Sequence, residues 1–163
     1  MSIKCFMMIG CPGSGKSYEA ERIARLEDAV IVSSDAIRGE LYGDESCQNN
    51  PKRVFELVDK RVREALESGK NVIMDATNIT GRHRARWVTK MKTDGIKMIA
   101  VVMETPLDLC LERQNLRDRK VPEDVICRMH WNLQGPTKEE GWDEIRLVYP
   151  DGHVTSFKPI IYD

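Results

Sequence analysis

The sequence predicts an α/β protein of three layers, with a mainly parallel five-stranded sheet between helices on both faces. Three observations predict this class. Apolar runs of strand length alternate with segments of helical periodicity along the chain. A glycine-rich loop joins the first apolar run to the first helical segment. The apolar run at 71–75 lacks polar alternation, which is typical of a strand covered on both faces.

The glycine-rich loop is the strongest motif. Residues 10–17 read Gly-Cys-Pro-Gly-Ser-Gly-Lys-Ser, between the apolar run 3–9 and the helical segment 18–26. This is the phosphate-binding loop motif in the strand–loop–helix context that it requires. Glycines let backbone N–H groups turn toward anionic oxygens, and the helix N-terminus adds a positive end. We therefore expect a bound nucleoside triphosphate, with Lys16 between its β- and γ-phosphates and Ser17 on Mg²⁺. The remaining residues of the expected nucleotide site are Gly10, Cys11, Pro12, Gly13, Ser14, Gly15 and Tyr18.

The remaining elements follow from periodicity and from turn residues. Strands are expected at residues 3–9, 29–33, 71–75, 97–103 and 144–148. Helices are expected at residues 18–26, 36–41, 52–68, 80–95, 106–116 and 122–134. The tail at 156–161 is expected to pair at a sheet edge. With no linker or repeat, residues 1–163 are predicted to form one domain.

Two aspartates follow predicted strands, where open α/β sheets bind their ligands. Asp35 follows the second strand and can accept the proton of an attacking hydroxyl; alternatively, Ser34 and Asp35 cap the next helix. Asp75 ends the third strand and can help to hold Mg²⁺; alternatively, it closes an Asx-type turn with residues 76–78.

Arginines near these positions suit phosphate binding. Arg38, one helical turn beyond Asp35, can grip a second phosphate on the acceptor, or it is a solvated surface residue. The most basic stretch holds Arg113, Arg117, Arg119 and Lys120. Arg113 and Arg117 are spaced i, i+4 and are expected on one helical face. They predict a lid at about 113–121 that covers the γ-phosphate; the alternative is a solvated charged face.

Composition limits the partners. The chain has 163 residues, a hydrophobic content of 41% and a net charge of −1, so nucleic acid would need a local basic patch. Five scattered cysteines form no C-x-x-C pair, which favours reduced thiols. No apolar run reaches membrane-spanning length and no signal peptide is evident, so we expect a cytoplasmic protein without membrane contact. The oligomeric state is left open.

Five segments carry a family resemblance. They are Gly10–Ser17, then SSDAIR at 33–38, VIMDATN at 72–78, ERQNLR at 112–117 and VPEDVI at 121–126. Together they resemble the kinase domain of the phage-type 5′-polynucleotide kinases, within the small P-loop kinases. The resemblance implies a P-loop kinase fold with an arginine-rich lid, and it covers most of residues 1–134.

The resemblance also implies roles for single residues. Lys16 and Ser17 would hold ATP·Mg²⁺, Asp35 would be the general base, and Arg38 would contact the acceptor's phosphate. Arg113 and Arg117 would form the lid. The segment that lines the acceptor side in this family matches Asp75, Thr77 and Asn78. The phosphatase motif D-x-D-x-T of bifunctional relatives does not occur in the sequence.

Three functions remain in competition. The first is an ATP-dependent kinase for the 5′-hydroxyl of DNA or RNA. The second keeps the fold but phosphorylates a small-molecule hydroxyl of a nucleoside, sugar or antibiotic. The third is a nucleotide-binding regulatory module without catalysis, against which the set Lys16, Ser17, Asp35 and Arg117 argues. The preferences between DNA and RNA and between ATP and GTP stay open, as does whether Asp75 contacts metal or acceptor.

Overall fold

The structure is a computed structural model and describes residues 2–118 and 120–159. Its strands form one sheet in the order β2-β3-β1-β4-β5-β6. The first five strands pair in parallel, as predicted, and β6 adds an antiparallel edge. The strands are β1 (Ile3–Ile9), β2 (Ala29–Ser33), β3 (Asn71–Asp75), β4 (Ile96–Met103), β5 (Glu144–Val148) and β6 (Val154–Phe157).

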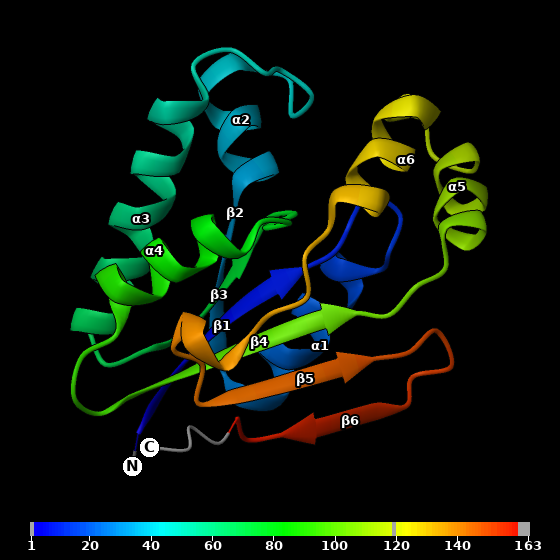
Figure 1. Cartoon of the computed structure of the whole chain (residues 1–163). Coiled ribbons are helices and arrows are strands. Elements are labelled where there is room, and N and C mark those ends of the chain that lie inside the picture. Colours follow the sequence, from blue (N-terminus) through cyan, green and yellow to red (C-terminus); the bar gives the residue numbers. More distant parts are fainter. Residues whose placement is uncertain (1, 119, 160–163) are drawn as a thin grey trace.

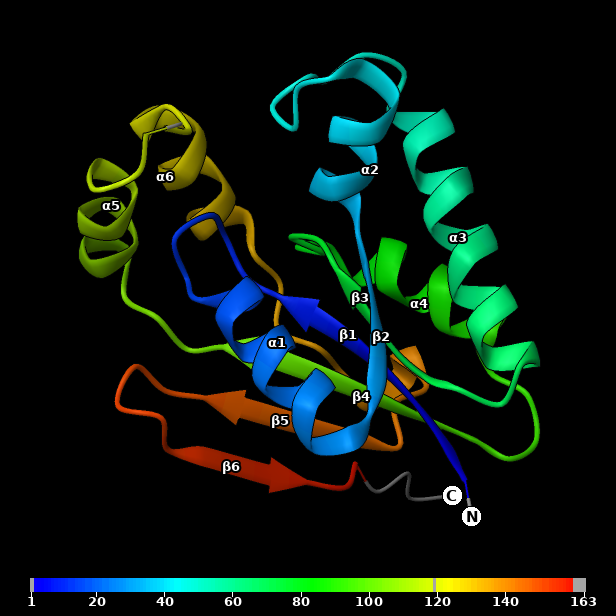
Figure 2. The ribbon, with the colours of Figure 1, turned by 180° about the vertical axis from the view of Figure 1, so that it is seen from behind.

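Helices cover both faces of this sheet, which confirms the predicted three layers. In Figure 1, α3 and α4 lie over one face, and the reverse view in Figure 2 shows α1 over the other. The helices α5 and α6 lie together beyond the carboxyl ends of the strands (Figure 1). The helices are α1 (Lys16–Glu27), α2 (Ser34–Tyr42), α3 (Pro51–Glu67), α4 (Gly81–Met91), α5 (Leu107–Asn115), α6 (Glu123–Asn132) and the short 3₁₀ helix η1 (Lys138–Glu140).

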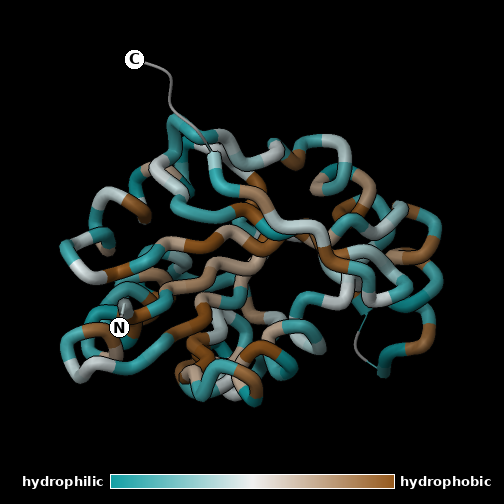
Figure 3. The backbone as a smooth tube through the Cα atoms, turned by 90° about the horizontal axis from the view of Figure 1, so that it is seen from below, coloured by the Kyte–Doolittle hydropathy of each residue, from teal (hydrophilic) through white to brown (hydrophobic). Residues whose placement is uncertain are grey.

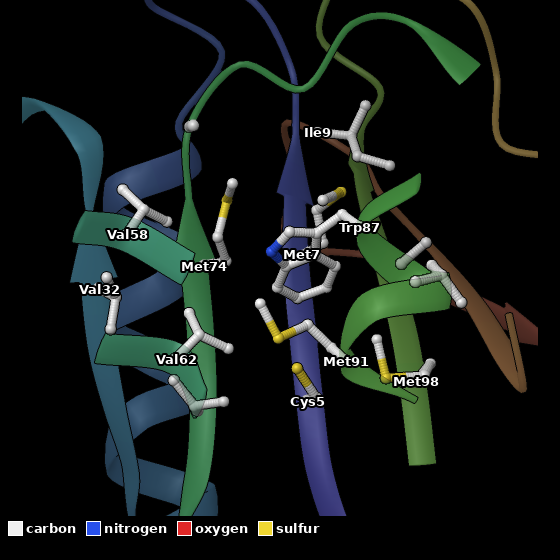
Figure 4. Packing of buried hydrophobic residues seen from close by; sticks show 14 of the residues in the cluster. Cys5, Met7, Ile9, Val32, Val58, Val62, Met74, Trp87, Met91 and Met98 are labelled. Atoms are coloured by element: carbon white, nitrogen blue, oxygen red, sulfur yellow. The ribbon is translucent and has the colours of Figure 1, made fainter. Parts of the chain in front are cut away.

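The central strand β1 is buried on both faces. Cys5 and Met7 point toward α4, where Trp87 and Met91 pack against them (Figure 4). The helices alternate hydrophobic and hydrophilic residues along the tube in Figure 3, as helices do that bury one side against a sheet. No helix among residues 2–118 and 120–159 is long and apolar enough to cross a membrane. The phosphate loop extends from this central strand, which pairs with β3 on one side and β4 on the other.

Three local expectations are corrected. Helix α5 ends at Asn115, so Arg117 lies beyond it, and the expected common helical face with Arg113 is wrong. The amide of Arg117 bonds to the carbonyl of Gln114, an i to i+3 bond of the tightened turn that ends α5. Helix α2 begins at Ser34, and the Ser33 hydroxyl, not Ser34 or Asp35, caps it.

The predicted edge pairing of the tail is confirmed, but it involves Val154–Phe157, which pair with β5. Residues 160 and 161 of the predicted tail lie outside the described residues.

Candidate active site

The phosphate loop turns between β1 and α1 with glycines at its two left-handed positions. Gly13 and Gly15 have φ angles of 85° and 95°. A Cβ at Gly13 would also collide with the backbone oxygen of Cys110 on α5. Only glycine satisfies both the backbone angle and this close approach. The phosphate loop thus packs directly against the backbone of α5.

Lys16 and Ser17 are the first two residues of α1, next to the helix N-terminus that favours anions. The Lys16 ammonium lies 3.5 Å from the carbonyl oxygen of Cys11, a long contact. Among the residues that the structure describes, no carboxylate forms an ion pair with Lys16. Its charge is therefore available to a phosphate.

Asp75 lies at the end of β3 beside Ser17. The Ser17 hydroxyl donates to Asp75 Oδ2 at 3.1 Å, and Asp75 is 7% exposed. Burial raises the pKa of Asp75; the charge of Lys16 and the Ser17 hydrogen bond oppose this shift, and the charge of Asp35 adds to it. The same electrostatic neighbourhood therefore contains Lys16 and both aspartates.

A hydroxyl and a carboxylate are ligands of the kind that Mg²⁺ prefers. In the described part of the chain, no cluster of three or more His, Cys, Asp or Glu residues could hold a metal. Ser17 and Asp75 thus fit a magnesium ion that takes its other ligands from phosphate and water, as is usual for Mg²⁺.

Asp35 lies in the first turn of α2, at the same edge of the sheet. Ser33, two residues earlier, is in register with Asp75 on the neighbouring strand. Because the Ser33 hydroxyl accepts the capping bond from the Ala36 amide at 3.2 Å, the Asp35 carboxylate is not needed as a cap. The Asp35 side chain is 62% exposed, so an acceptor can reach it.

Arg38 is held beside Asp35 rather than free in solvent. Its Nη1 donates to Asp35 Oδ1 at 2.8 Å, and its side chain is only 11% exposed. Its guanidinium also lies 5.8 Å from the ring centroid of Phe55 on α3, within cation–π range. The pair presents a carboxylate and a fixed guanidinium side by side.

Of the expected lid, Arg113 contacts the phosphate loop. Its Nη1 donates to the carbonyl of Gly13 at 3.3 Å. Arg117 is exposed in the segment after α5, Lys120 is exposed before α6, and Arg119 lies outside the described residues. Tyr18 follows Ser17 on α1 and is 73% exposed.

The segment after β3 forms hydrogen bonds with the backbone of β1 and of the phosphate loop. The carbonyl of Thr77 accepts a bond from the Gly10 amide at 3.1 Å. Asn78 is buried, has a φ of 49°, and donates from Nδ2 to the carbonyl of Met8 at 2.7 Å. The Asn78 amide therefore ties the loop to β1, and the expectation that this segment lines the acceptor side stays a prediction.

Sequence reasoning missed three supports of the site. Thr105, buried after β4, donates from Oγ1 to the carbonyl of Ser14 at 2.8 Å. Cys110 lies under Gly13. Arg84 is completely buried and donates from Nη1 to the carbonyl of Asn78 at 2.8 Å. The position of Thr105 just beyond a buried strand was the one signal in the sequence that could have found it.

The sequence was compared with models of protein families and with known proteins. A family model described as AAA domain matches residues 6–136. An L-seryl-tRNA(Sec) kinase from Methanococcus maripaludis is 26% identical over 163 aligned residues, which cover 96% of this chain and 61% of that protein. A cytidylate kinase from Pyrobaculum islandicum is 26% identical over 126 aligned residues, covering 72% of this chain and 62% of that protein.

Among solved structures, a chain in the Pnkp1/Rnl/Hen1 RNA repair complex aligns with a TM-score of 0.73 at 27% identity. The alignment covers 82% of this chain and 44% of that one. This chain therefore spans less than two thirds of both curated relatives and under half of the structural one.

Proposed function

This chain belongs to the AAA domain family, and on that premise we propose that it is an ATP-dependent kinase for the 5′-hydroxyl of a polynucleotide. The predicted similarity to the phage-type 5′-polynucleotide kinases, within the small P-loop kinases, is confirmed. The observation that carries the proposed acceptor is the Asp35–Arg38 pair at the edge of the sheet that also holds the phosphate loop.

On the donor side, the phosphate loop and Lys16 bind the triphosphate of ATP and neutralise its charge. Ser17 and Asp75 would hold Mg²⁺, which supplies further positive charge at the phosphates when bound. Arg113, already in contact with Gly13, stabilises the charge that develops on the transferred phosphoryl group, with Arg117 as the second lid arginine.

On the acceptor side, Asp35 accepts a hydrogen bond from the hydroxyl and takes its proton. The hydroxyl oxygen forms a bond to the γ-phosphorus, the bond from that phosphorus to the bridging oxygen breaks, and ADP leaves. Positioning and charge stabilisation supply most of the acceleration in such reactions, and a general base adds roughly 10²–10⁴.

A polynucleotide 5′ end offers the two groups that the pair matches. Its terminal sugar carries the reacting hydroxyl and, on its other side, a phosphodiester. Asp35 takes the first, and Arg38, held over Phe55 with little exposure, binds the second. The likeness to a chain of an RNA repair complex and to an L-seryl-tRNA(Sec) kinase supports an acceptor that carries nucleic acid.

A second candidate is a kinase of a small molecule. It is favoured by the similarity to a cytidylate kinase and by the net charge of −1, which gives no general attraction to nucleic acid. Such an acceptor would need an anionic group of its own to match Arg38.

One assay separates the two candidates. ATP labelled in its γ-phosphate is offered with 5′-hydroxyl DNA and RNA oligonucleotides, mononucleotides and nucleosides in parallel. We expect label at the 5′ end of an oligonucleotide. Label on small molecules alone, or on none of them while ATP binds, contradicts the proposed acceptor.

Asp35→Asn tests the base. We expect kcat to fall by roughly 10²–10⁴, because the amide cannot take the proton, while ATP affinity stays near that of the wild type. Asp108→Asn is the matched control, since Asp108 is also an exposed aspartate in the first turn of a helix. Unchanged turnover in Asp35→Asn would remove this residue from the mechanism.

A further inference from the structure

Two cysteines meet underneath the phosphate loop. Cys11 belongs to the loop, and Cys110 lies on α5, 99 positions later in the chain. Their sulfur atoms are 3.5 Å apart, and both residues are buried, at 3% and 0% exposure. No step of the proposed phosphoryl transfer uses either thiol.

The phosphate loop is in close contact with α5 around this pair. Gly13 lies against the carbonyl of Cys110, and Arg113, one turn further along α5, donates to the carbonyl of Gly13. Thr105 fixes the carbonyl of Ser14 from the segment that leads into α5. A displacement of Cys110 relative to Cys11 is therefore transmitted to the loop that would bind the phosphates.

The surroundings of Cys11 favour a reactive thiolate. The hydrogen bond between the two thiols lowers the pKa of Cys11 to about 6, burial opposes this shift, and His130 and Lys16 add to it. A pocket of about 560 Å³ is lined by Cys11, Thr105, Pro106 and His130. Small oxidants can thus reach Cys11 although little of its surface is exposed.

We propose that Cys11 and Cys110 form a reversible disulfide on exposure to a peroxide, and that this bond switches off nucleotide binding. The two sulfurs already lie close together, but disulfide sulfurs lie about 2.05 Å apart, so closure of the bond has to move Cys11 and its loop toward α5. Neither Cys5, buried in β1, nor the half-buried Cys47 and Cys127 takes part.

The chemistry proceeds in two steps. The Cys11 thiolate attacks one oxygen of hydrogen peroxide, the O–O bond breaks, and hydroxide leaves, which gives a sulfenic acid at Cys11. The Cys110 sulfur then attacks the Cys11 sulfur, the S–O bond breaks, and the departing hydroxide takes the Cys110 proton as water. In total the two thiols lose two electrons and two protons, and the peroxide becomes two waters.

Closure of the bond pulls Cys11 toward α5 and changes the direction of its peptide groups. The N–H groups of the loop then no longer converge on the phosphates. Loss of one charge-assisted hydrogen bond weakens binding by about tenfold, and we expect at least that effect.

The full chain is treated with hydrogen peroxide, digested without reduction, and mapped by mass spectrometry. Affinity for a fluorescent ATP analogue is measured before treatment, after it, and after dithiothreitol. We expect a peptide pair joined through Cys11 and Cys110, at least about tenfold weaker binding, and full recovery on reduction. The peptide map does not depend on the proposed kinase activity, so the two proposals can fail separately.

Two variants sharpen the test. Cys110→Ala, checked for folding by its thermal transition, is expected to keep its nucleotide affinity in peroxide. Cys127→Ala, at a half-buried cysteine on the adjacent α6, is expected to respond as the wild type does. The proposal is overturned if the wild type forms no such peptide pair, if the pair forms without loss of affinity, or if a folded Cys110→Ala loses affinity equally.

Discussion

The buried Asp75 carboxylate destabilises the folded protein when it is charged, at a position where the proposed function needs it. Its carboxylate is buried, and burial together with Asp35 raises its pKa, although Lys16 and Ser17 partly compensate. An acid with a higher pKa in the folded state holds its proton better when folded. The wild-type chain, free of nucleotide and metal, therefore loses stability as the pH rises through the folded pKa of Asp75.

Asp75→Asn removes this penalty. We expect the nucleotide-free variant to be more stable than the wild type near neutral pH, by on the order of 1 kcal/mol, because the neutral amide still accepts the Ser17 hydrogen bond. Urea unfolding at pH values from about 4 to about 8 measures this difference, which should shrink toward the acidic end. Phosphoryl transfer by the variant should fall at the same time, and a variant less stable than the wild type at neutral pH would contradict the argument.

Helix α2 positions both Asp35 and Arg38, and its start depends on Ser33. The Ser33 hydroxyl accepts the Ala36 amide, whereas Thr80, the corresponding residue of α4, forms no such side-chain bond. We expect Ser33→Ala to lower the free energy of unfolding by about 1 kcal/mol and Thr80→Ala by much less. Denaturant unfolding of the two variants checks this difference, and equal losses would rule out a special role of the Ser33 cap.

The elements were predictable from sequence where the determining signals are local. The bounds of β1, β2, β3 and β5 follow from apolar runs and the turn residues beside them, and the phosphate loop follows from its motif. The cap of α2 was misplaced because Ser33, Ser34 and Asp35 are all good capping residues. The common face of Arg113 and Arg117 was wrongly predicted because Arg117 suits a helix, whereas the tight turn that ends α5 before it comes from the fold.

Contacts between distant segments were not predictable. Cys11 meets Cys110 across 99 positions, and Arg84 meets Glu140 across 56. Such pairs depend on which strands become neighbours and on which helix faces pack, and a single sequence states neither. A helical arginine such as Arg84 also resembles any solvated residue until its burial is known.

At the scale of the whole molecule, the Arg84–Glu140 pair joins three separate parts. Arg84 Nε donates to Glu140 Oε1 at 2.9 Å and Nη2 donates to Oε2 at 3.2 Å, while Nη1 holds the carbonyl of Asn78. Glu140 also accepts from the Trp142 indole at 2.9 Å and from the Thr137 amide at 3.1 Å. The pair thus links the loop after β3, helix α4 and the η1 segment that leads to β5.

Removal of one member leaves the other buried without its counter-charge. We expect Arg84→Met to lower the free energy of unfolding by about 3–5 kcal/mol. Lys90→Met is the control on the same helix: Lys90 pairs with Asp59 at the surface, its side chain is 54% exposed, and its loss should cost less than about 1 kcal/mol. Urea unfolding measures both.

The double variant Arg84→Met with Glu140→Leu separates the charge effect from packing. Because it leaves no unpaired charge, we expect it to be more stable than Arg84→Met alone. Its Asn78 carbonyl still lacks the arginine donor, so acceptor turnover should stay below that of the wild type even where stability returns. If the double variant lost as much stability as Arg84→Met and Glu140→Leu together, the two residues would act independently. The link between the loop after β3 and η1 would then have to rest on other contacts.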